Sequence, residues 1–422
     1  MSVNRATMLL LLGFAIRESF SFWTGHPFDF ELWVRLGYAV THGGDPYGIL
    51  APVPGLSFAN IFSHDNAPTV AYLPFWALVT GSMYAIYSRT GIENRFLYYF
   101  LLKQPVIVGD VVLAYLLFSY VSARRASAGT WVLAFWLFSP FTVIISGIWG
   151  MFDSIAICFV MLSAMAVSEI RRAGWTGWAV FVKSIPVIYA APMTLRRPIK
   201  LKAVVALFVA FALPSALSAA TILAMHWSLS TVNATLVSTV GKGGPSMSVW
   251  DVFYYLVSLG VATVPAWLYT PLGFLWIPAI VGVTFIAVWT FRTETDCGLF
   301  QALLAITLVF LIFKARITEQ YALYFFSLAA VDVALWHPER RRILLASVAI
   351  AMIYLVVNNL FLVRFLAPIY PGFGSFEAMI YSVIGSANYT VNFLSGTTFT
   401  ILNIKYLVEI FRLRNRPAPM MV

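Results

Sequence analysis

Apolar stretches about 20 residues long recur along this chain, and they constrain its fold more strongly than any other feature. Each is long enough to cross the ~30 Å hydrocarbon core of a bilayer as a helix, and backbone groups in lipid must find their partners locally. Only 10% of the residues are charged, against about 25% in soluble domains. The sequence therefore predicts an all-α, polytopic membrane protein. The clearest stretches are 7–23, 97–121, 130–148, 151–168, 203–226, 271–291, 297–314, 320–336, 343–364 and 393–411.

The stretch 173–195 is interrupted by Lys183 and has basic residues at both ends, which predicts a short helical hairpin. With this hairpin the chain makes about twelve crossings. The first crossing starts close to Met1 and lacks a small-residue cleavage site, so we expect a retained helix. The two cysteines, Cys158 and Cys297, are too few for a disulfide framework or a four-cysteine zinc site.

Two further apolar stretches, 67–87 and 251–269, are ambiguous, and the basic residues decide between the alternatives. If both lie on the outer face, every basic cluster between spans faces the cytoplasm, as the positive-inside rule expects. The net charge of +10 then reflects topology, and we expect no nucleic-acid partner. The clusters are Arg5, Arg124 with Arg125, Arg171 with Arg172, Arg196 to Lys202, Arg340 to Arg342, and Arg412 to Arg416. The outer regions are 24–96, 227–270, 315–319 and 365–392.

These outer regions hold most of the remaining polar residues. Residues 30–41 have the pattern of an amphipathic helix lying in the interface. Asp29 precedes it, where a carboxylate either caps the helix or acts as a general base at the membrane surface. The outer polar residues include Asp29, Glu31, Arg35, Asp45, His64, Asp65, Lys242, Arg316 and Glu319.

Four charged residues in or beside the spans have two interpretations each. Lys103 and Asp110 lie seven residues apart and share a helix face, and a structural pair is favoured over a functional role. Asp153 follows a turn that begins at Trp149, and it either caps the next helix or faces a polar pocket. Lys183 is either a snorkelling lysine or part of the wall of a polar cavity.

The segment from Lys314 to Gln320 lies at an outer membrane boundary and also carries Arg316, Thr318 and Glu319. Its two cations suit a lipid-linked phosphate, held by charge-assisted hydrogen bonds. The alternative is ordinary anchoring at the interface.

Four local patterns resemble motifs of the GT-C superfamily of glycosyltransferases, which use polyprenyl-phosphate sugars as donors. The most specific is Lys183-Ser-Ile-Pro-Val-Ile-Tyr-Ala-Ala-Pro192. It resembles an element of the mannosyltransferase that adds the first mannose to glycosylphosphatidylinositol, and of its prokaryotic relatives. The Trp149 turn and the Glu319 region are also similar to the asparagine-linked-glycosylation glucosyltransferases. The other three patterns are Asp29 through Pro46-Tyr47, Ala71-Tyr72-Leu73-Pro74, and Thr318-Glu-Gln-Tyr-Ala-Leu-Tyr324.

The resemblance implies a catalytic transmembrane module over 1–336, variable C-terminal spans over 337–422, and no soluble domain. It implies transfer of a hexose, with mannose favoured over glucose, from a dolichyl- or polyprenyl-phosphate donor to a lipid-linked glycan or glycolipid acceptor. Asp29 matches the second acid of the family's Asp-x-Asp motif, and Pro27 stands where the first would be. We therefore expect no metal or other cofactor.

The implied roles complete the prediction. Asp29 is the general base, at the outer or lumenal face of a cell membrane in a prokaryote or of the endoplasmic reticulum in a eukaryote. Membrane lipids are expected partners. Whether a small membrane subunit also binds is left undecided by the sequence. Rival functions are a transporter or flippase, an oligosaccharyltransferase-like enzyme, and a non-catalytic subunit. The donor phosphate is assigned to Lys314, Arg316, Lys183 and Lys242. The sugar and acceptor are assigned to Glu31, Arg35, Tyr72, Asp153, Thr318, Glu319 and Gln320.

Overall fold

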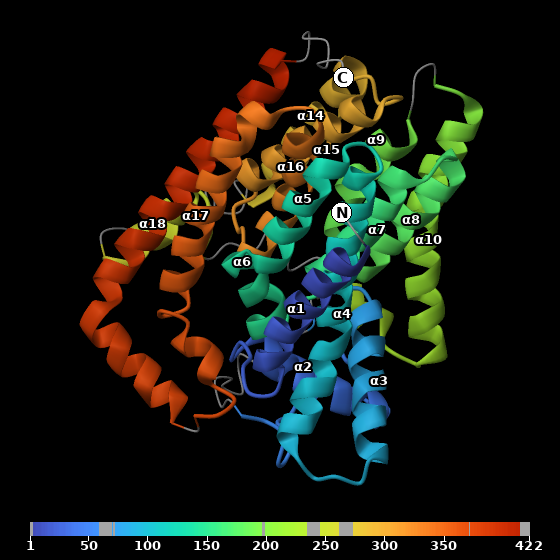
Figure 1. Ribbon diagram of the computed structural model, residues 1–422. Helices are drawn as coiled ribbons and strands as arrows, with labels where there is room; N and C mark the ends of the chain where they lie inside the picture. Colours follow the sequence, from blue (N-terminus) through green and yellow to red (C-terminus); the bar gives the residue numbers. More distant parts are fainter. Residues whose placement is uncertain are drawn as a thin grey trace.

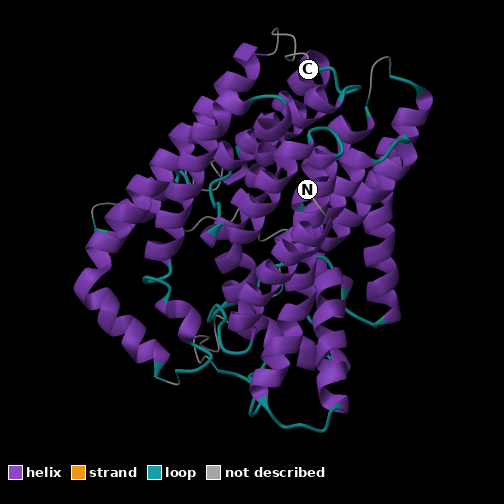
Figure 2. Ribbon diagram, in the orientation of Figure 1, coloured by secondary structure: helices purple, strands orange, loops and turns teal. Residues whose placement is uncertain are grey.

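The computed structural model describes residues 3–58, 70, 72–195, 199–233, 245–260, 273–370 and 372–413. Over these ranges the regular structure is helical, without a strand, which confirms the predicted all-α class (Figures 1 and 2). Three of the polar positions singled out above, His64, Asp65 and Lys242, lie outside the described residues.

Long helices and short helical turns alternate along the chain. The elements are α1 (Val3–Ser21), α2 (Asp29–Thr41), α3 (Phe75–Arg89), α4 (Arg95–Ser122), α5 (Ala126–Phe138), α6 (Pro140–Val143), η2 (Ile144–Trp149), α7 (Asp153–Met165), α8 (Glu169–Val182), η3 (Ile185–Tyr189), α9 (Ala190–Thr194), α10 (Leu201–Ala224), α12 (Asp251–Ser258), α14 (Trp276–Thr290), α15 (Asp296–Phe313), η4 (Glu319–Tyr321), α16 (Ala322–Leu335), η5 (Pro338–Arg340), α17 (Arg341–Asn358), η6 (Val363–Leu366) and α18 (Phe373–Leu413).

Within the described ranges, 4 helices are long and apolar enough to cross a membrane: α4, α10, α15 and η5 with α17. A fifth candidate is α5 together with α6 and η2, which are bent by 48° where Pro140 follows Ser139, since proline removes a helix hydrogen bond. The predicted number of about twelve crossings is not confirmed by this criterion, because helices such as α7 and α8 are shorter. The predicted hairpin is present: α8 ends at Val182, directly before Lys183, and η3 and α9 pack back against it.

The predicted interfacial helix is α2, which packs against α3 at the lower end of Figure 1. Its apolar face is buried, with Trp33 edge-on to Trp76 of α3 at 5.2 Å. The two helices approach so closely at Gly37 that a Cβ there would lie 2.7 Å from the carbonyl oxygen of Thr80. The ambiguous stretch 67–87 thus ends in a helix that rests on α2 and is not one of the candidate spans.

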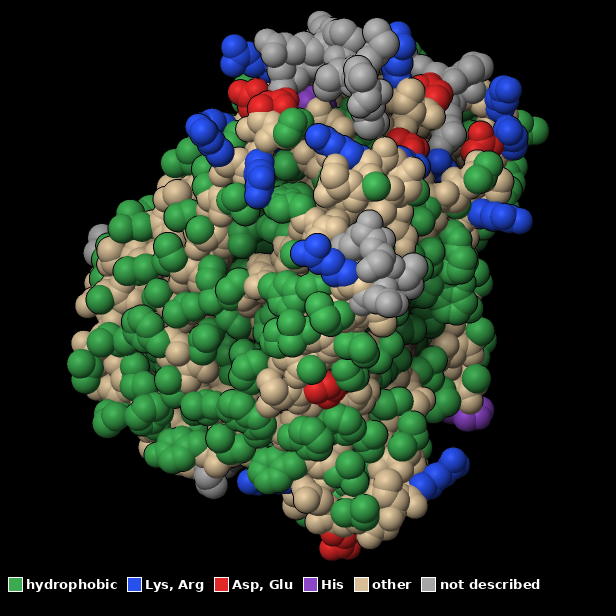
Figure 3. Space-filling model, in the orientation of Figure 1, with side chains coloured by type: hydrophobic (Ala, Val, Ile, Leu, Met, Phe, Trp, Pro, Cys, Tyr) green, Lys and Arg blue, Asp and Glu red, His purple; other side chains and the backbone are tan. Residues whose placement is uncertain are grey.

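The two ends of the bundle differ in chemistry. At one end Arg124, after α4, pairs with Asp296 of α15 at 2.6 Å, and Arg125 donates to the carbonyl of Ala334 in α16. Figure 3 shows basic side chains gathered at this end and an apolar surface over much of the face below. At the other end, the last residue of α15, Phe313, and the first residue of α16, Ala322, flank the polar segment 314–321.

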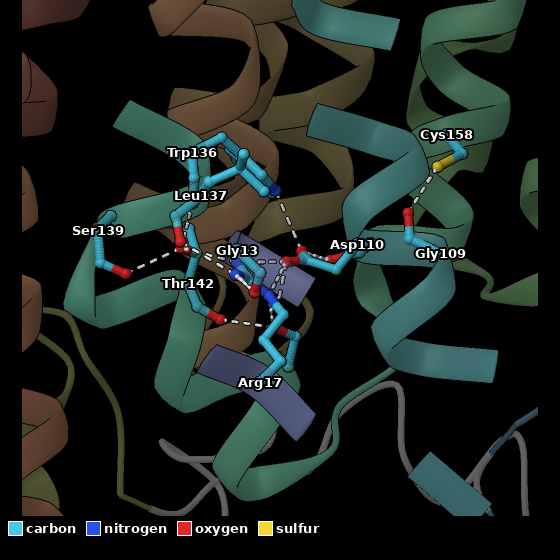
Figure 4. Close-up of polar contacts among 11 residues, drawn as sticks. Gly13, Arg17, Gly109, Asp110, Trp136, Leu137, Ser139, Thr142 and Cys158 are labelled. Atoms are coloured by element: carbon cyan, nitrogen blue, oxygen red, sulfur yellow. Dashed lines mark hydrogen bonds and ion pairs between the residues drawn. The ribbon is translucent and has the colours of Figure 1, made fainter. Parts of the chain in front are cut away.

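A buried ion pair between α1 and α4 corrects a prediction (Figure 4). Asp110 of α4 pairs with Arg17 of α1 at 2.6 Å, and both side chains are fully buried. The predicted pair of Lys103 with Asp110 is therefore wrong. Lys103 instead donates to the carbonyls of Gly147 and Ile148, because these groups at the end of η2 have no helical partner of their own.

Candidate functional site

Asp29 is the first residue of α2, and its side chain faces other elements. Its Oδ2 accepts a hydrogen bond from the indole Nε1 of Trp149 at 3.0 Å and lies 3.4 Å from Nδ1 of His26. The N-cap position of α2 is Phe28 and the Asp29 carboxylate accepts from Trp149, so the capping interpretation of Asp29 fails. Burial raises the pKa of Asp29, although the bond from Trp149 and the charges of Arg316 and Lys183 act to lower it. The side chain keeps 17% of its surface exposed, and Asp29 is therefore a partly accessible base.

Trp149 is held in place by its own loop. It ends the π-helix η2, and Gly150 follows with φ +91°, a left-handed conformation that favours glycine. The ammonium of Lys103 fixes the two carbonyls just before it, at 3.0 Å from Gly147 and 2.9 Å from Ile148. His26 stacks on the indole with 4.6 Å between ring centroids. These contacts orient the indole N–H of Trp149 that donates its hydrogen bond to Asp29.

His26 is neutral in this arrangement. Its Nδ1 accepts from the backbone N–H groups of Phe28 and Asp29, at 3.3 and 3.4 Å. Burial lowers the pKa of His26 well below its ordinary value, and the charge of Arg364 acts in the same direction. The 3.4 Å contact with the Asp29 carboxylate is therefore not an ion pair.

A second carboxylate, Asp153, begins α7 and pairs with Lys183 at 2.6 Å. Both side chains are buried, so Lys183 lines a polar cluster and does not snorkel. The other carboxylate oxygen of Asp153, Oδ1, is buried and has no hydrogen-bond partner among the described residues. The ammonium also lies 5.4 Å from the ring of Tyr321 and 5.7 Å from that of Tyr72. The cluster therefore contains an ion pair in which one carboxylate oxygen, Oδ1 of Asp153, lacks a hydrogen bond from the described residues.

Arg316 supplies a positive charge without an ion pair among the described residues. The chain is extended at Lys314 and at Thr318. Ile317 is pinned between them: its N–H donates to the hydroxyl of Ser246 at 2.9 Å, and its carbonyl accepts from the N–H of Met247 at 2.8 Å. Ile317 is buried and Arg316 is half-buried, as alternation along an extended chain predicts. Arg316 makes no hydrogen bond or ion pair with any residue in the described ranges, yet its charge acts on Asp29.

Lys314 and Glu319 are the other charged residues of the segment 314–320, and both contact neighbouring side chains. The ammonium of Lys314 lies over the Trp276 ring at 5.1 Å, and burial with the nearby Arg316 lowers its pKa to about 8. Glu319 is buried and accepts from the side-chain amides of Asn358 at 2.7 Å and Asn359 at 3.3 Å. Burial raises the pKa of Glu319, and the charge of Asp29 contributes.

Two further residues of this segment lie beside Glu319. Gln320 is buried, and its Oε1 has no partner within the described chain. Thr318 is half-buried directly before the η4 turn. The segment therefore brings Arg316, which has no ion pair among the described residues, Lys314 and several polar groups to the same end of the bundle.

Two residues that were predicted to bind the sugar or the acceptor substrate, Glu31 and Arg35, do not belong to this polar cluster. Glu31 is fully buried, pairs with Arg35 at 2.7 Å and accepts from the N–H of Phe58 at 3.0 Å. Arg35 also donates to the carbonyl of Leu50 at 3.1 Å. A buried ion pair needs further hydrogen bonds, and here the loop after α2 supplies them. Glu31 and Arg35 therefore hold this loop against the helix. Their assignment to the acceptor is corrected to a structural role.

An apolar groove of about 310 Å³ lies between α8 and α10, and sequence neighbours of Tyr72 and Lys183 help to line it. Leu73, the neighbour of Tyr72, and Val180 and Val187, on either side of Lys183, form part of its wall. Phe211 and Ile222 of α10 form the opposite wall. The groove therefore offers an apolar surface whose wall includes sequence neighbours of cluster residues.

Sequence reasoning missed His26 and the pair Asn358 and Asn359 as parts of this site. His26 stands three residues before Asp29, and that spacing is the only local signal. The two asparagines lie at the end of an apolar span and come close to Glu319 only through the packing of α17 against α16.

A comparison with protein-family models finds no match, and a search of curated proteins finds none either. Among the described residues, no group of three or more His, Cys, Asp or Glu side chains is arranged to hold a metal ion; metal independence stays a prediction. The function is therefore argued from the geometry of the cluster and from the resemblance of its motifs.

Proposed function

We propose that the protein is a glycosyltransferase that moves a hexose from a polyprenyl-phosphate donor to the hydroxyl of a lipid-linked acceptor. One observation carries this proposal. A partly exposed carboxylate, Asp29, lies within electrostatic reach of Arg316, a cation without an ion pair in the described ranges, and an apolar groove is lined by sequence neighbours of Tyr72 and Lys183. A base, an anion site and a surface for a lipid tail are the three parts that such a reaction needs.

The reaction inverts the configuration of the sugar. Asp29 takes the proton of the acceptor hydroxyl while its oxygen forms a bond to the anomeric carbon. The bond between that carbon and the phosphate oxygen breaks, and its electron pair stays on the phosphate. Asp29 is the better base of the two carboxylates because Asp153 is already paired with Lys183. The raised pKa of Asp29 makes its carboxylate a stronger base than an ordinary aspartate.

The leaving group explains why a free cation is needed. A polyprenyl phosphate gains one negative charge when the sugar departs, so the transition state is stabilised by a positive group aimed at its oxygens. Arg316 meets this need because it forms no ion pair with a carboxylate of the described residues. Lys314 adds a second positive charge when it is protonated. The N-termini of α2, α7 and η4, with Asp29, Asp153 and Glu319 in their first turns, contribute positive ends of helix dipoles.

The membrane arrangement of this proposal comprises about twelve crossings with the cluster on the outer or lumenal face. The clustering of basic residues at the other end supports it through the positive-inside rule. Cysteines at Ser82 of α3 and Ser168 before α8 test it, since both positions are exposed and lie at opposite ends. We expect an impermeant reagent to label position 82 from outside and to leave position 168 unlabelled in sealed cells.

Mannose is the favoured sugar because the element from Lys183 to Pro192 most resembles mannosyltransferases. The direct test incubates the purified protein in nanodiscs with polyprenyl-phosphate mannose or glucose and a glycolipid acceptor, and follows donor consumption. Vesicles loaded with the same donors test the transporter alternative. Movement of intact donor across the bilayer without any transfer would exclude the glycosyltransferase.

A further inference from the structure

A small polar cavity lies among α12, η6, α17 and α18, in the C-terminal part of the chain for which no motif predicts a function. Its volume is about 70 Å³, room for about five water molecules. Its walls carry three tyrosines, three asparagines, one aspartate, one arginine and one proline. A cavity with so many hydrogen-bonding groups differs from the apolar groove and raises the question of its ligand.

The charges that face this cavity are balanced or weak. Arg364 pairs with Glu377 at 2.6 Å and also donates to the Asn358 carbonyl and to the hydroxyl of Tyr381. Asp251 accepts from the N–H of Ser246, and burial raises its pKa to about 7. The cavity therefore does not select strongly for an anion or a cation, and a neutral polar ligand suits it best.

One buried amide oxygen in the wall, Oδ1 of Asn392, lacks a hydrogen-bond donor among the described residues. Asn392 is 6% exposed, and its Nδ2 donates to the side-chain oxygen of Asn388 at 2.9 Å. Its Oδ1 is buried without a hydrogen-bond partner among the described residues. Buried polar atoms are seldom left in this state, so a ligand with hydroxyl donors would complete the wall. Asn388 belongs to a glycosylation sequon, but it is buried within α18 and donates to the carbonyl of Val357.

The tyrosines present aromatic faces next to these amides. Tyr381 and Tyr389 lie nearly parallel, with ring centroids 6.2 Å apart, and Tyr254 meets Tyr389 edge-on at 5.8 Å. Aromatic rings pack against the C–H face of a sugar, while amides and carboxyls can both donate to and accept from its hydroxyls. This combination is typical of sites for neutral, hydroxyl-rich rings.

We propose that this cavity binds a neutral sugar, or another ring bearing several hydroxyls, in the head group of the acceptor. The inference rests on the proposed function, because it supplies the hydroxyl that Asp29 would deprotonate. Hydrogen bonds link the wall of the cavity to Glu319, and the charge of Asp29 acts on Glu319. Asn358 lines the cavity and donates to Glu319, and the neighbouring Asn359 also donates to Glu319. The C-terminal spans then hold the acceptor, and the N-terminal elements hold the base.

Direct binding tests the cavity without any need for transfer. We would titrate the protein, in nanodiscs free of glycolipid, with methyl α-mannoside, methyl α-glucoside and myo-inositol, and follow binding by saturation-transfer NMR. Asn392→Leu is nearly isosteric and removes the open acceptor, and we expect it to weaken binding at least tenfold. Asp251→Asn, a second variant, should weaken binding several-fold. The matched control is Asn403→Leu, which is also buried on α18 but lies about 16 Å further along the helix.

The outcomes separate this inference from the proposed function. Binding that Asn392→Leu weakens and that Asn403→Leu and Asp29→Asn preserve supports the cavity, even if no donor is consumed and the transferase proposal fails. In an active protein, Asn392→Leu should raise the acceptor KM at least tenfold and leave the donor KM unchanged. Failure of all three probes to bind, or unchanged binding in a folded Asn392→Leu protein, would overturn the assignment.

Discussion

Two buried ion pairs in this protein differ in how completely their hydrogen bonds are satisfied. Asp110 pairs with Arg17 and also accepts from Trp136, Ser146 and Ser154. Asp153 pairs with Lys183 alone, and its second oxygen has no partner in the described chain. Both pairs are removed from solvent, so burial alone does not distinguish them.

The difference indicates which pair stabilises the fold and which serves a site. A fully hydrogen-bonded buried pair fixes one arrangement of the helices around it. A pair with an open acceptor, next to the partly exposed Asp29 and the unpaired Arg316, leaves groups available for a ligand. We infer that the Arg17 and Asp110 pair is structural and that the Asp153 and Lys183 pair belongs to the site.

The largest effect on stability should come from breaking the structural pair. Arg17→Met leaves the Asp110 carboxylate buried without its partner, which should cost about 3–5 kcal/mol of the free energy of unfolding. Denaturation in mixed micelles measures it. The matched control is Arg124→Met, which removes one side of a partly exposed pair and should cost less than about 1 kcal/mol. Equal losses in the two variants would contradict the structural role of Arg17.

A smaller effect, on the donor alone, is expected at the unpaired cation. Arg316→Gln removes a charge-assisted contact with the donor phosphate worth about 1.5–3 kcal/mol, so donor affinity should fall about 10- to 100-fold. Its stability should hardly change, because Arg316 has no ion pair within the described ranges. Equilibrium binding of polyprenyl-phosphate mannose measures the loss. Unchanged affinity would remove Arg316 from the phosphate site.

The smallest effect should appear in the pH dependence of donor binding. The pKa of Lys314 is about 8, so its ammonium is charged below that pH and mostly neutral above it. Donor affinity should therefore fall several-fold between about pH 7 and pH 9, and this dependence should be absent in Lys314→Met. A Lys314→Met protein that keeps the same pH dependence would show that another group titrates.

Local patterns predicted those parts of the site that lie in short segments of sequence. The helix after Asp29 and the break at Lys183 follow from amphipathic spacing and from a charge within an apolar stretch. Arg17 as the partner of Asp110 was not predicted, because 7–23 was interpreted as an apolar span and the contact joins residues 93 positions apart. The Glu31 and Arg35 pair has ordinary i,i+4 spacing, but its burial under the following loop depends on tertiary packing.

The central claim is that Asp29 acts as the base of a glycosyl transfer, and one substitution tests it. Asn at position 29 can still accept the hydrogen bond from Trp149 but cannot take a proton. Asp29→Asn should therefore lower the rate of transfer from polyprenyl-phosphate mannose about 10²–10⁴-fold, with donor binding and unfolding unchanged. In the wild type the rate should rise with pH through the raised pKa of Asp29, because only the carboxylate is active. An Asp29→Asn protein that keeps more than about a tenth of the wild-type rate would contradict the account, and Asp153 would be the next base to test.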